Sequence, residues 1–265
     1  MSGDQIKIAT ALTRAETYTA TYNVGTGLTL TIFDGGVADG TVLLNGNYSA
    51  AHFTVSDTGN IDTITTDAAC FMAGTIIRTP DGEVAVETLK RGDLVLTSDG
   101  QAKPVSWLGR QTISTVFADP IRVWPIRIKA GALADNVPSR DFLLLPDHAV
   151  LVDGALIQAG ALVNGTSIIR ETNVQPIFTY YHVEVDDHSL ILAENTPAET
   201  FVDNVDRLAF DNWAEHQALY PEGKSINQFP YPRAKAHRQV PVNIRVMLAE
   251  RAQLIGAVVD TAAVA

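Results

Sequence analysis

The sequence predicts an all-β protein with one helix near its C-terminus. Two early stretches, residues 17–22 and 27–33, alternate with a period of two, which is typical of half-buried strands. Turn dipeptides follow them at Asp34-Gly35, Asp39-Gly40 and Asn45-Gly46, because Gly tolerates positive φ and Asx side chains bond their own backbone. Over residues 70–200, many short strands recur at regular spacing with little helical periodicity.

The composition limits the class of protein. The 265 residues are 46% hydrophobic and 18% charged, with a net charge of −11 and a sequence pI near 4.9. This apolar fraction suits a buried core and excludes a disordered chain or a collagen-like fibre. We expect no nucleic-acid partner, since phosphate binding needs clustered Lys and Arg. We also expect no membrane span and no secretory signal, because no uncharged run is long enough and residues 1–7 lack the basic-then-apolar pattern.

Three segments are expected along the chain. Residues 1–66 form a small antiparallel β hairpin module, which ends in a polar linker. Its Asp- and Gly-rich turns are interpreted as hairpin turns, because the nonapeptide repeat of calcium-binding β-rolls is absent. Residues 67–200 form a second, strand-rich domain. Residues 201–265 form an extension, in which apolar residues at helical spacing over 240–255 predict a helix docked on the β body.

The second domain begins with a series of hairpins. Residues 74–79 predict a strand, the Pro-Asp-Gly at 80–82 a turn, and residues 83–86 a return strand. Residues 94–97 predict the next strand, which a turn connects to residues 103–109.

Cys70 is the only cysteine, which excludes an internal disulfide and a Cys-rich zinc site. A single thiol is more often a small buried hydrophobe than a nucleophile. However, Cys70 stands where the linker meets the second domain, and its sulfur could attack the Ala69 carbonyl and turn that amide into a thioester. Adjacency in the chain supplies proximity. The reaction also needs a proton donor for the leaving nitrogen and stabilisation of the tetrahedral state. We expect no metal or cofactor.

Histidine is the side chain that exchanges a proton near neutral pH, and the chain has six. His148 lies at the start of a predicted strand, directly after a Pro-Asp turn. His182 and His188 lie in a predicted strand pair over residues 180–192. The other three are interpreted as surface or structural residues: His52, His216 and His237.

Three blocks of sequence carry these candidates. The first is Cys70-Phe71-x-x-Gly74-Thr75, followed by Gly92-Asp93-x-Val95. The second is Pro146-Asp147-His148 with Leu151 and Gly154, followed by residues 161–165. The third is Tyr181-His182-Val183-Glu184-Val185 with His188. Together and in this order, they resemble the Hint domain, the hedgehog/intein autoprocessing module, and are closest to the variety found in bacterial secreted proteins. The resemblance covers residues 70–200.

The resemblance implies a fold and three catalytic residues. The fold is a compact, pseudo-symmetric all-β horseshoe that brings the nucleophile beside the strand of His148. Cys70 would make an N-to-S acyl shift at the Ala69–Cys70 bond, and His148 would protonate or distort that amide. His182 stands where the family often places an Asp or another polar catalytic residue.

Departures from the family pattern bear on the outcome. Leu145 stands where splicing domains commonly have a Thr that helps to hold the scissile amide. No His-Asn pair closes the domain, since Glu194 precedes Asn195, which we interpret as a turn residue. The chain also continues from residue 200 to residue 265. We therefore expect self-cleavage at the N-terminal bond instead of full splicing, with the fused β module as substrate and water, a thiol or an amine as acceptor.

Two other functions stay open at this point. The first is an inactive Hint-like fold that serves as a structural or adhesive secreted module. It is favoured by Leu145 and by the missing His-Asn pair, and it predicts an inert full-length chain whose Cys70 sulfur is buried away from His148. The second is a conventional cysteine hydrolase, which needs a Cys–His pair oriented by a third residue in an open pocket. The resemblance and the acidic N-terminus suggest export by a route that needs no N-terminal signal.

Overall fold

The computed structural model describes most side chains that follow residue 69. Before that point it describes the backbone of the strands, and after Gly256 the backbone of the last helix as far as Ala262. In between it covers residues 70–115, 120–200, 210–224, 226 and 231–256, with backbone only at 120 and 122. The chain forms two compact units: Met1–Asp67 with Asp203–Ala209, and Ala68–Val202 with Phe210–Ala265. The predicted segment boundaries after residues 66 and 200 stay a prediction.

The first unit contains two three-stranded antiparallel sheets, with strand orders β2-β3-β4 and β1-β6-β5. The strands predicted at 17–22 and 27–33 are confirmed as β2 and β3. The turn predicted at Asp39-Gly40 is wrong. Ile32 pairs with Gly40 and Phe33 with Ala38, so Asp39 is an extra residue that forms a bulge inside β4. The bounds are β1 Ile6–Ile8, β2 Glu16–Asn23, β3 Gly27–Asp34, β4 Val37–Leu44, β5 Thr54–Asp57 and β6 Asp62–Thr65.

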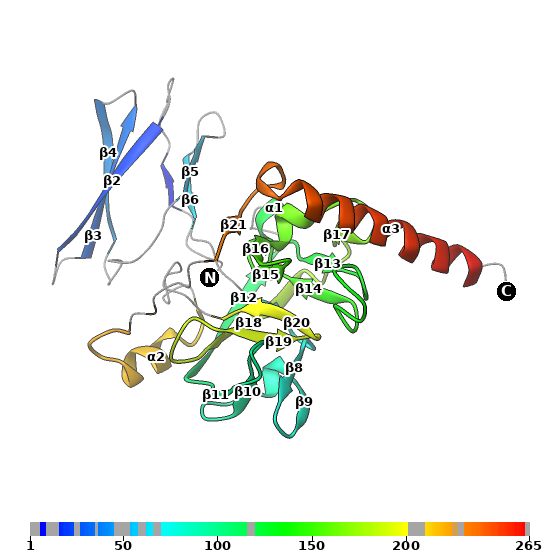
Figure 1. The fold of residues 1–265 in the computed structure, drawn as a ribbon. Helices are drawn as coiled ribbons and strands as arrows, with labels where there is room; N and C mark the ends of the chain where they lie inside the picture. Colours follow the sequence, from blue (N-terminus) through cyan, green and yellow to red (C-terminus); the bar gives the residue numbers. More distant parts are fainter. Residues whose placement is uncertain are drawn as a thin grey trace. The chain divides into compact units, whose positions relative to one another are not determined.

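The second unit is built on two larger sheets (Figure 1). The six-stranded sheet has the order β12-β18-β7-β14-β13-β17, and its neighbours pair antiparallel. The short strand β7 lies inside this sheet, between strands that are distant in sequence. The residue that precedes β7 is therefore enclosed. The bounds are β7 Phe71–Met72, β12 Trp107–Ser114, β13 Ile126–Ile128, β14 Phe142–Leu144, β17 Ile168–Arg170 and β18 Ile177–Glu184.

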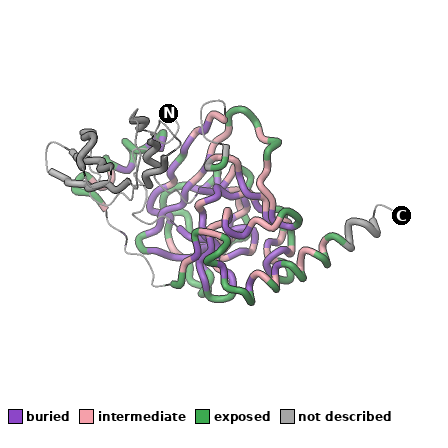
Figure 2. Tube along the Cα trace, turned by 90° about the horizontal axis from the view of Figure 1, so that it is seen from above, coloured by how far each residue is buried: buried purple, intermediate pink, exposed green. Residues whose placement is uncertain are grey.

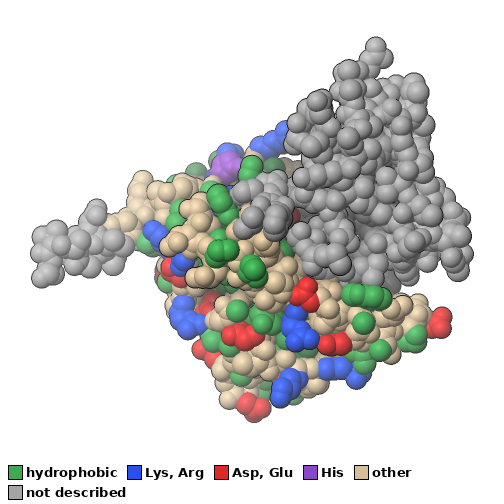
Figure 3. All heavy atoms as spheres, turned by 180° about the vertical axis from the view of Figure 1, so that it is seen from behind, with side chains coloured by type: hydrophobic (Ala, Val, Ile, Leu, Met, Phe, Trp, Pro, Cys, Tyr) green, Lys and Arg blue, Asp and Glu red, His purple; other side chains and the backbone are tan. Residues whose placement is uncertain are grey.

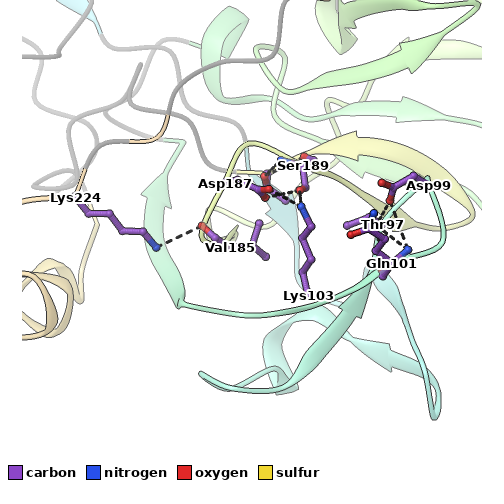
Figure 4. A network of polar contacts seen from close by, with 9 residues as sticks. Thr97, Asp99, Gln101, Lys103, Val185, Asp187, Ser189 and Lys224 are labelled. Atoms are coloured by element: carbon purple, nitrogen blue, oxygen red, sulfur yellow. Dashed lines mark hydrogen bonds and ion pairs between the residues drawn. The ribbon is translucent and has the colours of Figure 1, made fainter.

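The seven-stranded sheet has the order β21-β16-β15-β20-β19-β8-β9. Its edge strand β21 comes from the C-terminal extension and pairs parallel with β16. A separate hairpin joins β10 to β11, and Thr97 and Asp99 bond within its turn (Figure 4). The bounds are β8 Ile76–Thr79, β9 Gly82–Ala85, β10 Leu94–Leu96, β11 Ala102–Pro104, β15 Ala149–Val152, β16 Ala155–Gln158, β19 Leu190–Ala193, β20 Thr196–Glu199 and β21 Arg233–Ala234.

The predicted all-β class is confirmed, and so is the C-terminal helix. Buried apolar side chains from both sheets form one core, to which α3 adds Ile244 and Leu248. Figure 2 shows buried positions throughout the body of this unit, whereas exposed positions in α3 alternate with buried and partly buried ones. Among the described residues, no helix has the length and apolar character needed to cross a bilayer. The helices are α1 Pro120–Val123, α2 Trp213–Leu219 and α3 Val242–Ala262, with 3₁₀ turns at Val86–Thr88, Ala159–Leu162 and His237–Gln239.

One face of the second unit carries mixed charge. On the face seen in Figure 3, acidic and basic side chains are interspersed, and apolar side chains are scattered between them. Neither sign of charge dominates the described part of that face. A mixed surface of this kind favours solubility.

Gly109 in β12 lies against two aromatic rings, which leads to a stability prediction. A Cβ at this position would lie 2.8 Å from ring atoms of Phe210 and Trp107, whose centroids are 5.2 Å apart. We expect Gly109→Ala to lower the free energy of unfolding by about 1–3 kcal/mol, because the rings must shift. The matched control is Gly256→Ala in α3, where a Cβ meets nothing within 4 Å. It should stabilise by about 0.5–1 kcal/mol in urea unfolding. Equal effects of the two substitutions would contradict this packing.

Candidate active site

Cys70 is fully buried directly before β7. The register pairs Phe71 with Tyr181, which places the preceding Cys70 level with His182 on β18. On the other side, the backbone N–H of Leu145 donates to the carbonyl oxygen of Cys70 at 3.2 Å. Strand pairing therefore positions the backbone of Cys70 from both sides.

The Cys70 thiol contacts a buried imidazole. Its Sγ lies 3.5 Å from Nδ1 of His182, whose exposed fraction is 1%. The ring of His182 packs edge-on against Phe210, with centroids 5.5 Å apart, and this contact orients the imidazole. Burial raises the pKa of the Cys70 thiol, so the resting sulfur is protonated and needs a base before it can act as a nucleophile. A neutral imidazole nitrogen at this distance can accept that proton.

His148 is fully buried beside the same segment. Its ring centroid lies 4.4 Å from that of Phe71. Nε2 lies 3.0 Å from the carbonyl oxygen of Glu199, and because a carbonyl only accepts, Nε2 carries a proton. Nδ1 makes no hydrogen bond of normal geometry with a described residue. Burial lowers the pKa of His148, and interactions with the backbone of Cys70 and with Glu199 act in the opposite direction.

The side chain of Glu199 is also buried and paired. Nε2 of His188 lies 2.9 Å from Oε1 of Glu199. Arg233, on β21, holds both carboxylate oxygens, with Nη1 3.2 Å from Oε2 and Nη2 on Oε1. Burial raises the pKa of Glu199, but the hydrogen bonds from His188 and Arg233 outweigh it and lower the pKa to about 2. Glu199 is therefore ionised at neutral pH.

The ionised Glu199 should make the stability of the protein depend on pH. A Glu in an unfolded chain has a pKa of about 4.3, whereas that of folded Glu199 is about 2. The stabilisation is therefore present above about pH 4.3 and is lost as the pH falls toward 2, and it is on the order of 3 kcal/mol. In urea unfolding from pH 7 to pH 2, the advantage of wild type over Glu199→Gln should shrink across this window. Parallel stability curves would contradict the pairing.

Two lysines hold the turn between β18 and β19 that carries His188 (Figure 4). Nζ of Lys103 donates to the carboxylate of Asp187 at 2.5 Å. Nζ of Lys224 donates to the carbonyl oxygen of Val185 at 3.4 Å. Burial raises the pKa of Asp187, but hydrogen bonds, with that from Lys103 foremost, outweigh it and lower this pKa. The turn is thus fixed by charged contacts on both of its sides.

Glu184, at the end of β18, is a second fully buried carboxylate. Nζ of Lys224 lies 3.0 Å and Nε2 of His216 3.3 Å from its oxygens. Burial lowers the pKa of Lys224, but Asp186 and Glu184 outweigh it and raise this pKa. This cluster anchors α2, which carries His216, onto β18.

The structure places the other residues that the sequence singles out. His216 is a buried partner of Glu184, and His237 is exposed, with Nδ1 3.2 Å from a backbone carbonyl oxygen. Asn195 is confirmed as a turn residue. Its φ is 60°, and its side-chain amide donates to the carbonyl oxygen of Asn136 at 2.9 Å. His52 lies outside the described residues, and so does Ala69, the residue on the other side of the predicted scissile bond.

Neither Glu199 nor Arg233 is among the candidate site residues that the sequence predicts. Charged side chains are rarely fully buried, so no local pattern predicts the burial of Glu199 at the end of its strand. Arg233 lies in a two-residue strand that no periodicity indicates. Their pairing becomes visible only once β21 is placed at the sheet edge.

Comparisons with known proteins find one family match and solved structures of low sequence identity. A family model described as the Hint domain matches residues 69–205, a range that contains Cys70, His148 and His182. Among solved structures, the chain is similar to the solution structure of a bacterial intein-like domain from Clostridium thermocellum. The two are 21% identical, and the alignment covers 51% of this chain and 99% of that one with a TM-score of 0.38. It is also similar to the crystal structure of the MchDnaB-1 intein, with 15% identity, 49% and 99% coverage and a TM-score of 0.34. No curated protein matches the chain.

Proposed function

The chain belongs to the Hint domain family, and from this we propose that it cleaves its own Ala69–Cys70 peptide bond. One observation carries the proposal. The sulfur of the only cysteine, at the start of the family segment, lies 3.5 Å from a buried imidazole nitrogen on a strand 112 residues away. A buried structural thiol does not need such a partner, whereas a nucleophile with a raised pKa does.

The first step is an N-to-S acyl shift. The proton of the Cys70 thiol passes to Nδ1 of His182, and the sulfur attacks the carbonyl carbon of Ala69. The C–N bond of the amide then breaks as His148 donates a proton to the nitrogen of Cys70. The products are a thioester between Ala69 and the Cys70 sulfur and a free amino group on Cys70. One proton has moved from sulfur to nitrogen, and the two histidines return to their resting states by exchanging a proton with solvent.

His148 can donate only from Nδ1, because the hydrogen of Nε2 is held by the carbonyl oxygen of Glu199. Donation from Nδ1 requires the imidazolium form, and this form is scarce above the lowered pKa of His148. The backbone hydrogen bond from Leu145 holds the carbonyl oxygen of Cys70 while the bond on its other side breaks. In this step, His182 accepts the proton of the sulfur, and His148 donates a proton to the leaving nitrogen.

The second step resolves the thioester. Water, a thiol or an amine attacks the Ala69 carbonyl carbon, and the sulfur of Cys70 leaves and regains a proton. The N-terminal β module is released or transferred, and residues 70–265 remain as one chain. Full splicing is not proposed, because Asn195 is bonded within a turn and Glu194 stands in place of a penultimate His.

Leu145 favours a second candidate function, an inactive Hint fold that serves as a structural or adhesive module. Its buried side chain is apolar where the family commonly has a Thr that holds the scissile amide. The bacterial secreted variety of the family is also part of the proposal and rests on the acidic, Asp- and Gly-rich N-terminal module.

Incubation with and without dithiothreitol tests the proposed function. Intact mass spectrometry of the purified chain should show conversion into two fragments that correspond to residues 1–69 and 70–265, and the thiol should accelerate it. A chain that stays whole through this treatment supports the inactive module and contradicts self-cleavage.

A further inference from the structure

Arg233 lies beyond the residues matched by the family model and still reaches the candidate active site. It belongs to β21, which pairs parallel with β16 through Leu156↔Arg233. From there its guanidinium contacts both oxygens of the Glu199 carboxylate, in the two-pronged geometry in which Arg binds a carboxylate most strongly. The exposed fraction of the Arg233 side chain is 24% and that of Glu199 is 2%.

Glu199 is held at both of its ends. Its carboxylate lies between Arg233 and His188, and its carbonyl oxygen lies 3.0 Å from Nε2 of His148. The carbonyl fixes both the plane of the His148 ring and the nitrogen that carries the hydrogen. A shift of the Glu199 side chain would therefore be transmitted through one residue to the imidazole.

We propose that Arg233 is a positioning residue for His148, acting through the carboxylate and backbone carbonyl of Glu199. This inference rests on the proposed function, in which His148 protonates the leaving nitrogen. With this role for Arg233, the C-terminal segment contributes to catalysis. It also agrees with cleavage at the N-terminal bond alone, because a break at Asn195 would separate β19 from the strand that carries Glu199.

Substitution of Arg233 tests this role through the rate of self-cleavage. Displacement of a catalytic group by about 1 Å lowers a rate by about 10²-fold. We expect Arg233→Gln to slow fragment formation by about 10- to 100-fold, and Arg233→Lys to retain an intermediate rate, because Lys keeps the charge and loses the two-pronged contact. The matched control is Arg251→Gln. Arg251 is in the same segment, and its guanidinium pairs with Asp135 at 2.8 Å instead of with Glu199. This control should cleave at the wild-type rate.

A second readout follows the His148 ring directly. The ¹⁵N shifts of His148 should show hydrogen on Nε2 in wild type and a mixture of tautomers in Arg233→Gln. A loss of stability alone would not produce this change in a protein that stays folded by circular dichroism. If Arg233→Gln does not fold, the cleavage rate and the ¹⁵N shifts of His148 are both judged on Arg233→Lys.

The outcomes separate the two proposals. Cleavage of wild type, together with unchanged rates and His148 shifts in both Arg233 variants, overturns the positioning role and leaves the proposed function intact. Failure of wild type to cleave overturns the proposed function. In that case the ¹⁵N shifts still decide whether Arg233 orients His148: altered shifts support the contact and unaltered shifts overturn it.

Discussion

Cys70→Ala is expected to abolish cleavage of the Ala69–Cys70 bond. The substitution removes the sulfur that attacks the carbonyl in the proposed mechanism, and no other cysteine in the sequence can replace it. Intact mass spectrometry of the variant after incubation with dithiothreitol should show only the full-length chain. Cys70→Ser is the informative companion, because it keeps a hydrogen-bonding nucleophile of far lower acidity and should cleave much more slowly than wild type.

The result depends on the variant keeping its fold. Cys70 is small and fully buried, so its replacement by Ala leaves a small cavity in the core, and the thermal midpoint should fall by a few degrees while the protein stays folded. A Cys70→Ala protein that still yields a fragment ending at Ala69 would remove the thiol from the mechanism.

His148→Gln is expected to slow cleavage by about 10²- to 10⁴-fold, the usual contribution of a general acid. Gln keeps a donor for the carbonyl oxygen of Glu199 but cannot supply a proton to the leaving nitrogen. The pH dependence is a second signature. Because burial lowers the pKa of His148, the protonated ring becomes scarce as the pH rises through that value. The wild-type rate constant should therefore fall on the alkaline side, and the variant should lack this fall.

His237→Gln provides the matched control for His148→Gln. His237 is exposed, contacts a backbone carbonyl oxygen at 3.2 Å and lies outside the proposed mechanism. Its replacement should leave the rate and the pH profile unchanged. The same loss of rate in both histidine variants would mean that His148 acts through stability and not through its proton.

The fold was largely predictable because its strands are regular. Period-two stretches lie in β2 and β3, and apolar residues at helical spacing lie in α3. The exception, Asp39-Gly40, shows what a dipeptide alone cannot predict. The same dipeptide suits a turn or a bulge, and only the pairing of β3 with β4 decides between them. The bounds of α3 also extend beyond the predicted range to Ala262, because helix formation continues where the periodic signal ends.

The candidate site was predictable only in part. Cys70, His148 and His182 could be predicted as site residues, because each stands in one of the three sequence blocks that resemble the family. The Cys70–His182 contact depends on the register of β7 against β18, which no local pattern specifies. The Glu199–Arg233 pair depends on the parallel pairing of β21, which brings a distant segment to the sheet edge.

Hydroxylamine trapping tests the central claim most directly, since a thioester between Ala69 and Cys70 reacts with this amine and an ordinary amide does not. Tandem mass spectrometry of the treated protein should find an N-terminal fragment that ends in a hydroxamate on Ala69, and a second fragment that starts with a free Cys70. A chain whose Ala69–Cys70 bond hydroxylamine leaves intact would contradict the account, whereas cleavage at Asn45-Gly46 or Asn164-Gly165, bonds of a type that hydroxylamine cuts without a thioester, would not.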